Sequence, residues 1–235
     1  MQKTILIEER FCGPPGMANG GYVSGIMAQA FDGSAEVTLR RPVPVERPLR
    51  LEPRPDGSVA LQDGDDVLAE ARPARLDLEP PAPPSYAEAE AASARYPDQE
   101  EHPLPNCFVC GPAREGGDGL QVFAGPVAGR RLVAAPWTPA ASLADESGTV
   151  APHFLWAALD CPGAFAADPE QEHPLLLGRL TAAVERAVRP GEQCVVAGWL
   201  LEQSGRKYFT GTALFSPSGA LVARAKAVWF APKSE

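Results

Sequence analysis

The sequence lacks an apolar run long enough to cross a lipid bilayer. A transmembrane helix needs about 20 consecutive apolar residues, and no stretch of the 235 residues approaches that length. The first ten residues, Met1 to Arg10, also become charged too early for a secretory signal peptide. We therefore expect a cytoplasmic protein that has no membrane partner.

An excess of positive charge is missing too, and so is a regular set of cysteine pairs. The chain carries 30 acidic against 21 basic side chains, a formal net charge of −9, which argues against a nucleic-acid partner. Five cysteines, an odd number scattered along the chain, do not form the disulfide framework of an extracellular domain. The chain does have an ordinary apolar fraction of 45%, which is enough for a packed core.

The first 79 residues form one predicted structural unit. It contains a helix from Asn19 to Phe31 that is apolar on nearly every face, and such a helix is buried on all sides. Asn19 is a good N-cap for it. Strands are predicted at residues 4–11, 35–40, 48–52, 58–62 and 66–78, and the last two are joined by a hairpin signal at Gln62-Asp63-Gly64-Asp65.

A linker rich in Pro, Ala and Glu covers residues 80–105, with a short helix between Tyr86 and Arg95. Residues 106–235 then repeat the order of the first unit, which indicates a duplication. The second unit has predicted strands at 119–123 and 130–136, an apolar helix at 150–159, and strands at 175–188, 193–202, 207–215 and 220–230.

Three short segments and one acidic residue stand out from this background. Asn19-Gly20-Gly21 begins the first apolar helix, and Asp160 follows the second. The second unit opens with Cys107-Phe108-Val109-Cys110-Gly111 and Gly119-Leu120-Gln121-Val122-Phe123. Together these segments resemble the hotdog-fold acyl-CoA thioesterases, especially the phenylacetyl-CoA type, whose buried helix starts at His-Gly-Gly or Asn-Gly-Gly and carries an acidic residue further along.

The resemblance implies an α+β fold, a double hotdog with two antiparallel sheets that each wrap a buried central helix. Residues 1–79 would be the N-terminal hotdog half, 80–105 the linker and 106–235 the C-terminal hotdog half. Association into a homo-oligomer through the sheets is left open.

The departures from the family pattern are complementary. The first helix has Ala28 where the acidic residue would fall, and the second has Ala151-Pro152-His153 where the glycines would be. Because homodimeric relatives build each site from a glycine of one subunit and a carboxylate of the other, the resemblance implies one composite site. A Gln on the last strand of the larger double-hotdog thioesterases is replaced in this chain by the Lys226-Ala227 region.

This residue set suits the chemistry of a thioester. The first turn of a helix offers unpaired backbone amides and the positive end of the helix dipole, and glycines let a carbonyl approach them. Asn19, Gly20 and Gly21 are therefore expected to polarise the carbonyl. Asp160 would act as a general base or as a nucleophile, and Pro162 should end or bend the helix just after it.

Each candidate also has a purely structural alternative. Asn19, Gly20 and Gly21 would serve as a cap with tight packing, and Asp160 would pair with an arginine. Substrate contacts are predicted for Tyr22, Ser24, His153 and Trp156, with core packing as their alternative. Cys107 and Cys110 have zinc-knuckle spacing, but no second pair follows, so zinc would need further ligands recruited from outside the pair, such as His102 or Cys12. We expect no metal and no cofactor other than CoA as part of the substrate.

The sequence thus predicts an enzyme that hydrolyses an acyl thioester, most simply an acyl-CoA. One alternative is a hotdog hydratase or dehydratase acting on acyl thioesters, with His153 and Asp160 as its catalytic pair. The other is a non-catalytic acyl-CoA-binding hotdog module.

Overall fold

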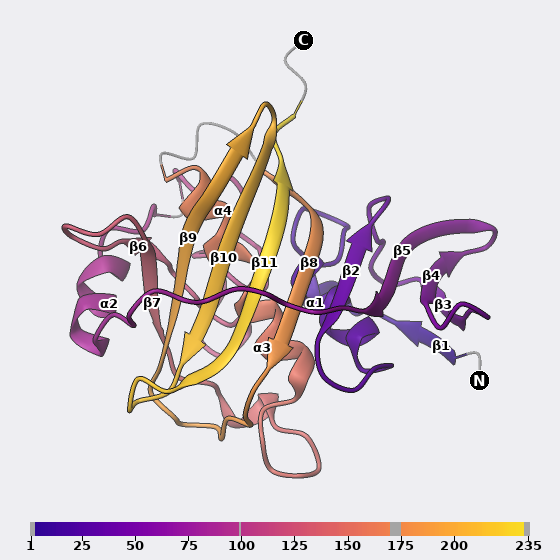
Figure 1. The fold of residues 1–235 in the computed structure, drawn as a ribbon, viewed down its shortest axis with the longest axis horizontal. Coiled ribbons are helices and arrows are strands. Elements are labelled where there is room, and N and C mark those ends of the chain that lie inside the picture. Colours follow the sequence, from indigo (N-terminus) through magenta and orange to yellow (C-terminus); the bar gives the residue numbers. More distant parts are fainter. Residues whose placement is uncertain (1–2, 99, 170–174, 233–235) are drawn as a thin grey trace.

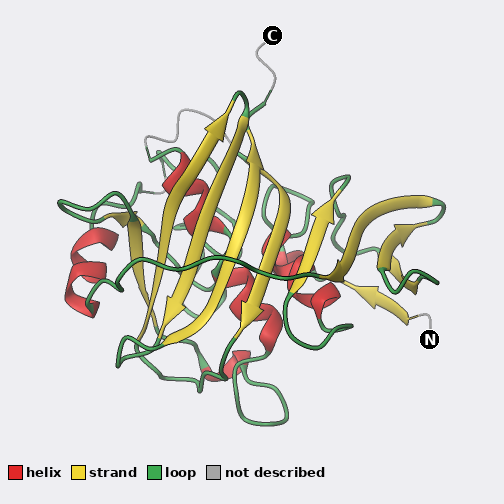
Figure 2. Cartoon of the chain, in the orientation of Figure 1, coloured by secondary structure: helices red, strands yellow, loops and turns green. Residues whose placement is uncertain are grey.

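The structure is a computed structural model that describes residues 3–98, 100–169 and 175–232. Within these ranges, eleven strands form one antiparallel sheet, and α1, α3 and α4 lie against one of its faces (Figures 1 and 2). The strands are β1 (Lys3–Leu6), β2 (Ala35–Leu39), β3 (Pro48–Pro53), β4 (Val59–Asp63), β5 (Asp66–Pro73), β6 (Gly125–Pro126), β7 (Val133–Trp137), β8 (Leu176–Val184), β9 (Cys194–Ser204), β10 (Lys207–Phe215) and β11 (Leu221–Phe230). The helices are α1 (Gly20–Ala28), α2 (Tyr86–Ser93), α3 (Pro152–Ala158) and α4 (Cys161–Ala167). The predicted α+β class is confirmed.

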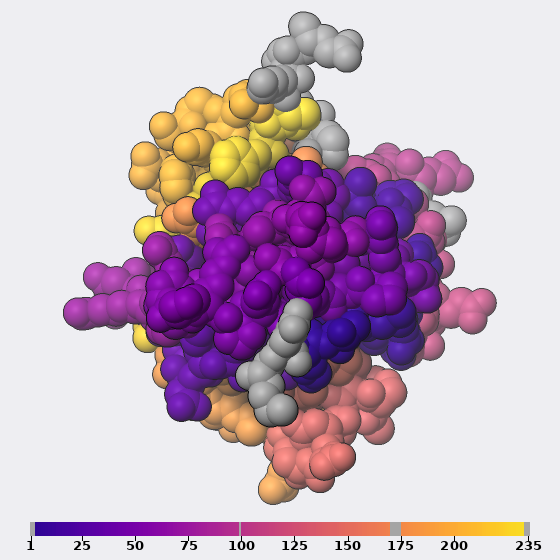
Figure 3. Space-filling model, turned by 90° about the vertical axis from the view of Figure 1, so that its right-hand side faces the viewer, coloured from indigo at the N-terminus to yellow at the C-terminus, as the bar shows by residue number. Residues whose placement is uncertain are grey.

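The sheet has the same strand order in its two halves. From the middle outward, one half runs β2-β5-β4-β3-β1 and the other runs β8-β11-β10-β9-β7, with β6 at its end. Seen from the side of the N-terminal strands, the first unit covers the middle of the molecule, and parts of the second extend above and below it (Figure 3). The two halves of the sheet therefore have the repeated order of elements that the sequence predicts.

The prediction of two separate sheets is wrong. Strand β2 pairs with β8 in antiparallel register, from Ala35 opposite Ala182 to Thr38 opposite Arg179. An edge strand exposes unpaired backbone groups, so pairing the two edges satisfies these groups and joins both halves into one sheet.

Helices α1 and α3 cross in close contact, and two glycines of α1 make this possible. A Cβ atom at Gly25 would lie 2.5 Å from the His153 Cα, and one at Gly21 would lie 2.5 Å from the Asp160 Cβ. Most of α1 is buried, as its apolar sequence predicts. Across the described ranges, no helix is both long and apolar enough to span a membrane.

The segment between β5 and α2, which leads into the predicted linker, crosses the face of the sheet opposite to α1 and α3 (Figure 1). Leu78 packs there in a second apolar cluster with residues of β7, β9 and β10, and its carbonyl accepts a hydrogen bond from Arg224 at 2.6 Å. The predicted linker helix is present as α2, which begins with a capping box between Ser85 and Glu88. The domain boundaries at residues 79 and 105 stay a prediction.

Several predicted strands are corrected by the structure, and those expected at residues 66–78 and 175–188 end at Pro73 and Val184. Strand β1 ends at Leu6, because a 3₁₀ turn at Glu9–Phe11 redirects the chain before α1. Residues 119–123 form no strand: Gln121 has a φ of 55°, and the segment hydrogen-bonds instead to the cysteine-containing turn, with the Leu120 amide donating to the Phe108 carbonyl at 2.8 Å.

We expect Gly25→Ala to destabilise the protein by about 1 to 3 kcal/mol, because the new methyl group has no space against α3. Urea-induced unfolding measures this change. Gly116→Ala is the matched control, since a Cβ at Gly116 meets nothing within 4 Å, and its effect should stay within about 0.5 kcal/mol. Equal stability of the two variants would contradict the close helix crossing.

Candidate active site

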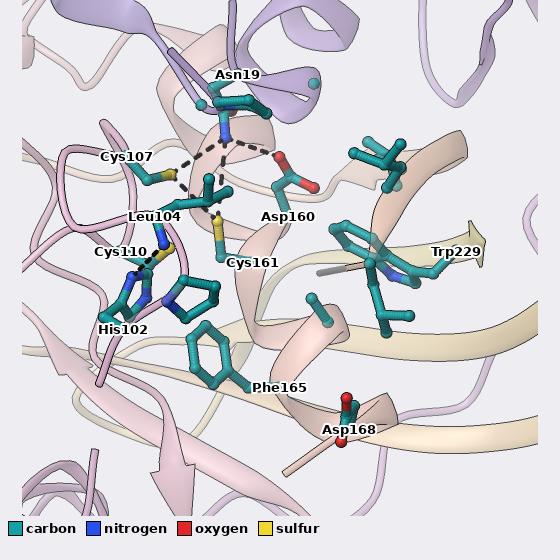
Figure 4. A pocket seen from close by; sticks show the side chains of 18 residues that line it. Asn19, His102, Leu104, Cys107, Cys110, Asp160, Cys161, Phe165, Asp168 and Trp229 are labelled. Atoms are coloured by element: carbon teal, nitrogen blue, oxygen red, sulfur yellow. Dashed lines mark hydrogen bonds between the residues drawn. The ribbon is translucent and has the colours of Figure 1, made fainter. Parts of the chain in front are cut away.

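The carboxylate of Asp160 joins the two halves of the chain. Asp160 lies between α3 and α4 and is only 3% exposed. Its Oδ2 atom accepts a hydrogen bond from the Gly21 amide at 2.8 Å. The same oxygen accepts a second one from the Asn19 Nδ2 group at 2.9 Å (Figure 4). Asn19 and Gly21 stand about 140 positions earlier in the sequence, so this contact depends on the tertiary fold.

Local sequence signals place each member of this contact. Asn19 is the N-cap of α1, and its Oδ1 atom accepts from the Tyr22 amide at 2.9 Å, which leaves the Nδ2 group free to turn toward Asp160. Pro162 stands in the first turn of α4, and the chain bends at Asp160, whose ψ is −81°. The bend that Pro162 predicts therefore directs the Asp160 carboxylate toward the start of α1.

Burial raises the pKa of Asp160 to about 7, and the hydrogen bonds from Gly21 and Asn19 counteract this shift in part. Both donors bind Oδ2. The other oxygen, Oδ1, is buried and has no hydrogen-bond partner among the described residues. Because a buried polar atom without a partner is costly, Oδ1 is the position at which a ligand or water from the adjoining cavity would bind.

An apolar cavity adjoins Asp160 and has walls from both halves. Its empty space amounts to about 680 Å³, the open mouth included. Asn19, Gly20 and Asp160 line it together with Phe165 and Trp229. Gly20 is the first residue of α1, so its amide has no acceptor inside the helix.

A second apolar groove meets this cavity at Gly20, Leu176 and Leu177, which line both. Leu176 is 57% exposed there, an unusual position for a large apolar side chain at the mouth of a cavity. Arg40 and Arg41 border the groove and form exposed ion pairs with acidic residues of β5 at 2.8 and 3.0 Å.

The four predicted substrate-contact residues lie elsewhere. Tyr22 stacks on Phe11 with ring centroids 4.2 Å apart, and Ser24 donates to the Gly20 carbonyl at 2.8 Å. Trp156 is buried against Gly25. None of these, nor His153, lines the cavity beside Asp160, so their substrate contacts stay predictions.

His153 is held by a neighbouring side chain and is not paired with Asp160. Its Nδ1 atom lies 3.0 Å from the Gln29 side-chain amide. Burial lowers the pKa of His153 to about 4, so the imidazole is neutral at neutral pH.

Sequence reasoning missed several residues that the fold brings to the site. His102, Phe165, Leu177 and Trp229 line the cavity, but they come from four separate segments and share no motif. Cys161 directly follows Asp160 in the sequence, and no local pattern links it to the Cys107–Cys110 pair. In the structure its thiol meets those of Cys107 and Cys110, all within 4.8 Å of one another.

This chain is similar to known proteins in its structure. No protein-family model and no curated protein matches the sequence. A protein of unknown function from Alicyclobacillus acidocaldarius, described as having the hot dog fold, superposes over 100% of this chain and 94% of its own, with a TM-score of 0.61 and 13% identity. This chain has the hotdog fold.

Two further structures of this fold are similar over nearly their whole length. The tesB protein of Mycobacterium avium subspecies paratuberculosis is 14% identical over 99% of this chain and 93% of its own, with a TM-score of 0.65. The acyl-CoA thioesterase II TesB2 of Mycobacterium marinum is 15% identical over 100% and 94%, with a TM-score of 0.61. At such identities the similarity establishes the fold.

We expect Asn19→Ala to lower the free energy of unfolding by about 2 to 4 kcal/mol, because it removes both the helix cap and a donor to a buried carboxylate. Asn19→Ser keeps an acceptor for the cap and should recover about 1 kcal/mol of this loss. Urea unfolding of the three proteins provides the measurement. An alanine variant as stable as the parent would show that the Asn19–Asp160 contact does not hold the halves together.

Proposed function

We propose that this chain is a double-hotdog enzyme that hydrolyses an acyl thioester, an acyl-CoA, at one composite site. The observation that carries the proposal is the meeting of the Gly21 amide and the Asn19 side chain with the Asp160 carboxylate beside an apolar cavity. Asn19 and Gly21 come from the helix of the first half, and Asp160 comes from the second half. The similar structure described as an acyl-CoA thioesterase II supports the same substrate class.

The contacts divide the chemical roles among these residues. Because the Gly21 amide already donates to Asp160, we assign polarisation of the thioester carbonyl to the Gly20 amide at the start of α1. Gly21 and Asn19 are then positioning residues that orient the carboxylate. This refines the expectation that all three residues act on the carbonyl.

Asp160 supplies the base through its unpartnered Oδ1 atom. It takes a proton from a water molecule while the water oxygen bonds to the carbonyl carbon. The tetrahedral intermediate then breaks its carbon–sulfur bond, and the leaving thiolate receives the proton from Asp160. The products are a carboxylic acid and a thiol. Direct attack by the carboxylate is the other role open to Asp160.

The two connected hollows suit the two parts of such a substrate. The acyl chain fits the apolar cavity between Phe165 and Trp229. The carrier then leaves along the groove past Leu176, toward Arg40 and Arg41, whose guanidinium groups suit phosphates. Gly20 stands where the hollows meet, which is where the thioester would lie.

The geometry does not favour the hydratase alternative. That reaction was assigned to His153 acting with Asp160, but the His153 ring lies against Gln29 and outside the cavity lining. The next experiment distinguishes an enzyme from a non-catalytic binding module, because such a module would bind acyl-CoA without releasing thiol.

Asp160→Asn should reduce acyl-CoA hydrolysis by about 10² to 10⁴-fold, because the amide cannot accept a proton from water. Thiol release from a panel of acyl-CoAs, followed with a thiol-reactive dye, measures the rate. Asp168→Asn is the control, since Asp168 lines the same cavity and should leave the rate within a few-fold. Full activity of the Asp160 variant would rule out the proposed mechanism.

Gly21→Ala should reduce the rate much more than Gly25→Ala. Both substitutions crowd the same helix crossing, with Cβ positions 2.5 Å from atoms of the second half, but only the one at Gly21 meets Asp160. Displacing the carboxylate by about 1 Å can cost about 10²-fold in rate. The comparison is made at matched fractions of folded protein, and equal losses in rate would mean that Asp160 is not positioned by Gly21.

A further inference from the structure

Three buried thiols lie together next to Asp160. The sulfur atoms of Cys107, Cys110 and Cys161 are all within 4.8 Å of one another, and those of Cys107 and Cys161 are 3.7 Å apart. Three sulfur ligands on a tetrahedral zinc ion, each about 2.3 Å from the metal, would be separated by about 3.8 Å. The thiols therefore already have nearly the spacing that one zinc ion requires.

The turn that carries two of these cysteines is built tightly around the sulfur atoms. The amide of Gly111 donates to the Cys107 carbonyl at 2.9 Å, and a Cβ at Gly111 would lie 2.5 Å from the Cys107 nitrogen. Cys107 is 1% exposed and Cys110 is 3% exposed, so the turn holds both residues almost entirely away from solvent.

Polar groups around the thiols point to a ligand that belongs among them. The Asn19 Nδ2 group lies 3.9 Å from the Cys107 sulfur and 4.0 Å from that of Cys161 (Figure 4). Asp160, only 3% exposed, has its Oδ1 atom without a hydrogen-bond partner among the described residues. Cys107, Cys110, Cys161 and Asp160 line the same cavity, so a ligand bound at the fourth position of a metal would reach this oxygen.

His102 and Cys12, the two possible further zinc ligands named from the sequence, form hydrogen bonds with other groups. The Nδ1 atom of His102 accepts from the Leu104 amide at 2.9 Å, so its proton is on Nε2, which lies 2.7 Å from the Tyr96 hydroxyl. That hydroxyl donates in turn to the Cys110 carbonyl at 2.9 Å. Cys12 contacts the Asn106 carbonyl and the Arg114 guanidinium at 3.4 and 3.2 Å. The fourth position is thus left open to the cavity.

We propose that Cys107, Cys110 and Cys161 bind one zinc ion whose fourth coordination position opens into the cavity toward Asp160. Three thiolates favour zinc over magnesium or calcium, which prefer oxygen ligands, and an open fourth position is typical of catalytic zinc sites. The spacing in the sequence predicted no metal because the third ligand, Cys161, stands 54 positions after Cys107.

The test measures zinc content of the full chain, produced with zinc supplied and purified without chelators or metal-affinity resin. We expect about one zinc ion per chain in the parent protein and less than about a tenth of this in Cys107→Ser and Cys161→Ser. Cys194→Ala is the control, because Cys194 is buried but lies outside the cluster, and it should retain the full zinc content.

Two further measurements use the parent protein, so they test the proposal even where the cysteine variants fail to fold. Reduced parent protein reconstituted with Co²⁺ should develop sulfur-to-cobalt charge-transfer absorption and the visible bands of a tetrahedral site. A strong chelator should lower the Tm of the zinc-loaded parent. Parent protein that takes up neither metal under reducing conditions, or that holds a Cys107–Cys161 disulfide there, overturns the proposal. None of these results depends on thioester hydrolysis, so either proposal can fail alone.

Discussion

The hydrogen bond from the Gly21 amide to the Asp160 carboxylate is the contact on which the arrangement of this molecule depends. It forms only because a glycine on α1 lets the backbone of that helix reach α3 and the residues after it. The same crossing positions Asn19 against Asp160 and leaves Gly20 at the junction of the two hollows. One close helix contact therefore sets the packing of the halves and the geometry of the site.

The site concentrates groups that are unfavourable for stability. Asp160 is almost fully buried, its pKa is raised to about 7 by burial, and one of its oxygens has no partner among the described residues. Three thiols lie beside it without forming a disulfide. Proteins retain such features mainly where they have a function. The surrounding apolar core and the continuous sheet provide the stability that holds these groups in place.

Most predictions that rested on residues close together in the sequence were confirmed, whereas those that depended on contacts between distant segments were wrong or stay untested. Alternating and apolar patterns predicted the order of strands and helices, because periodicity reflects burial within a single element. Residues 119–123 are not a strand because their backbone amides hydrogen-bond to the turn that carries Cys107 and Cys110 instead of to a neighbouring strand. Two sheets were expected because nothing local in β2 or β8 shows that their edges pair. The substrate contacts of Tyr22, Ser24, His153 and Trp156 stay untested.

By itself, the sequence determined the two apolar helices, the capping role of Asn19, the chain break near Asp160 and the repeated order of elements. Each of these follows from residues that are neighbours along the chain, where sterics and hydrogen bonding act directly. Only the tertiary structure decided that Asp160 meets Gly21, that Cys161 joins Cys107 and Cys110, and which residues line the cavity. Those contacts join distant segments, and their geometry is fixed by how the helices cross and how β2 pairs with β8.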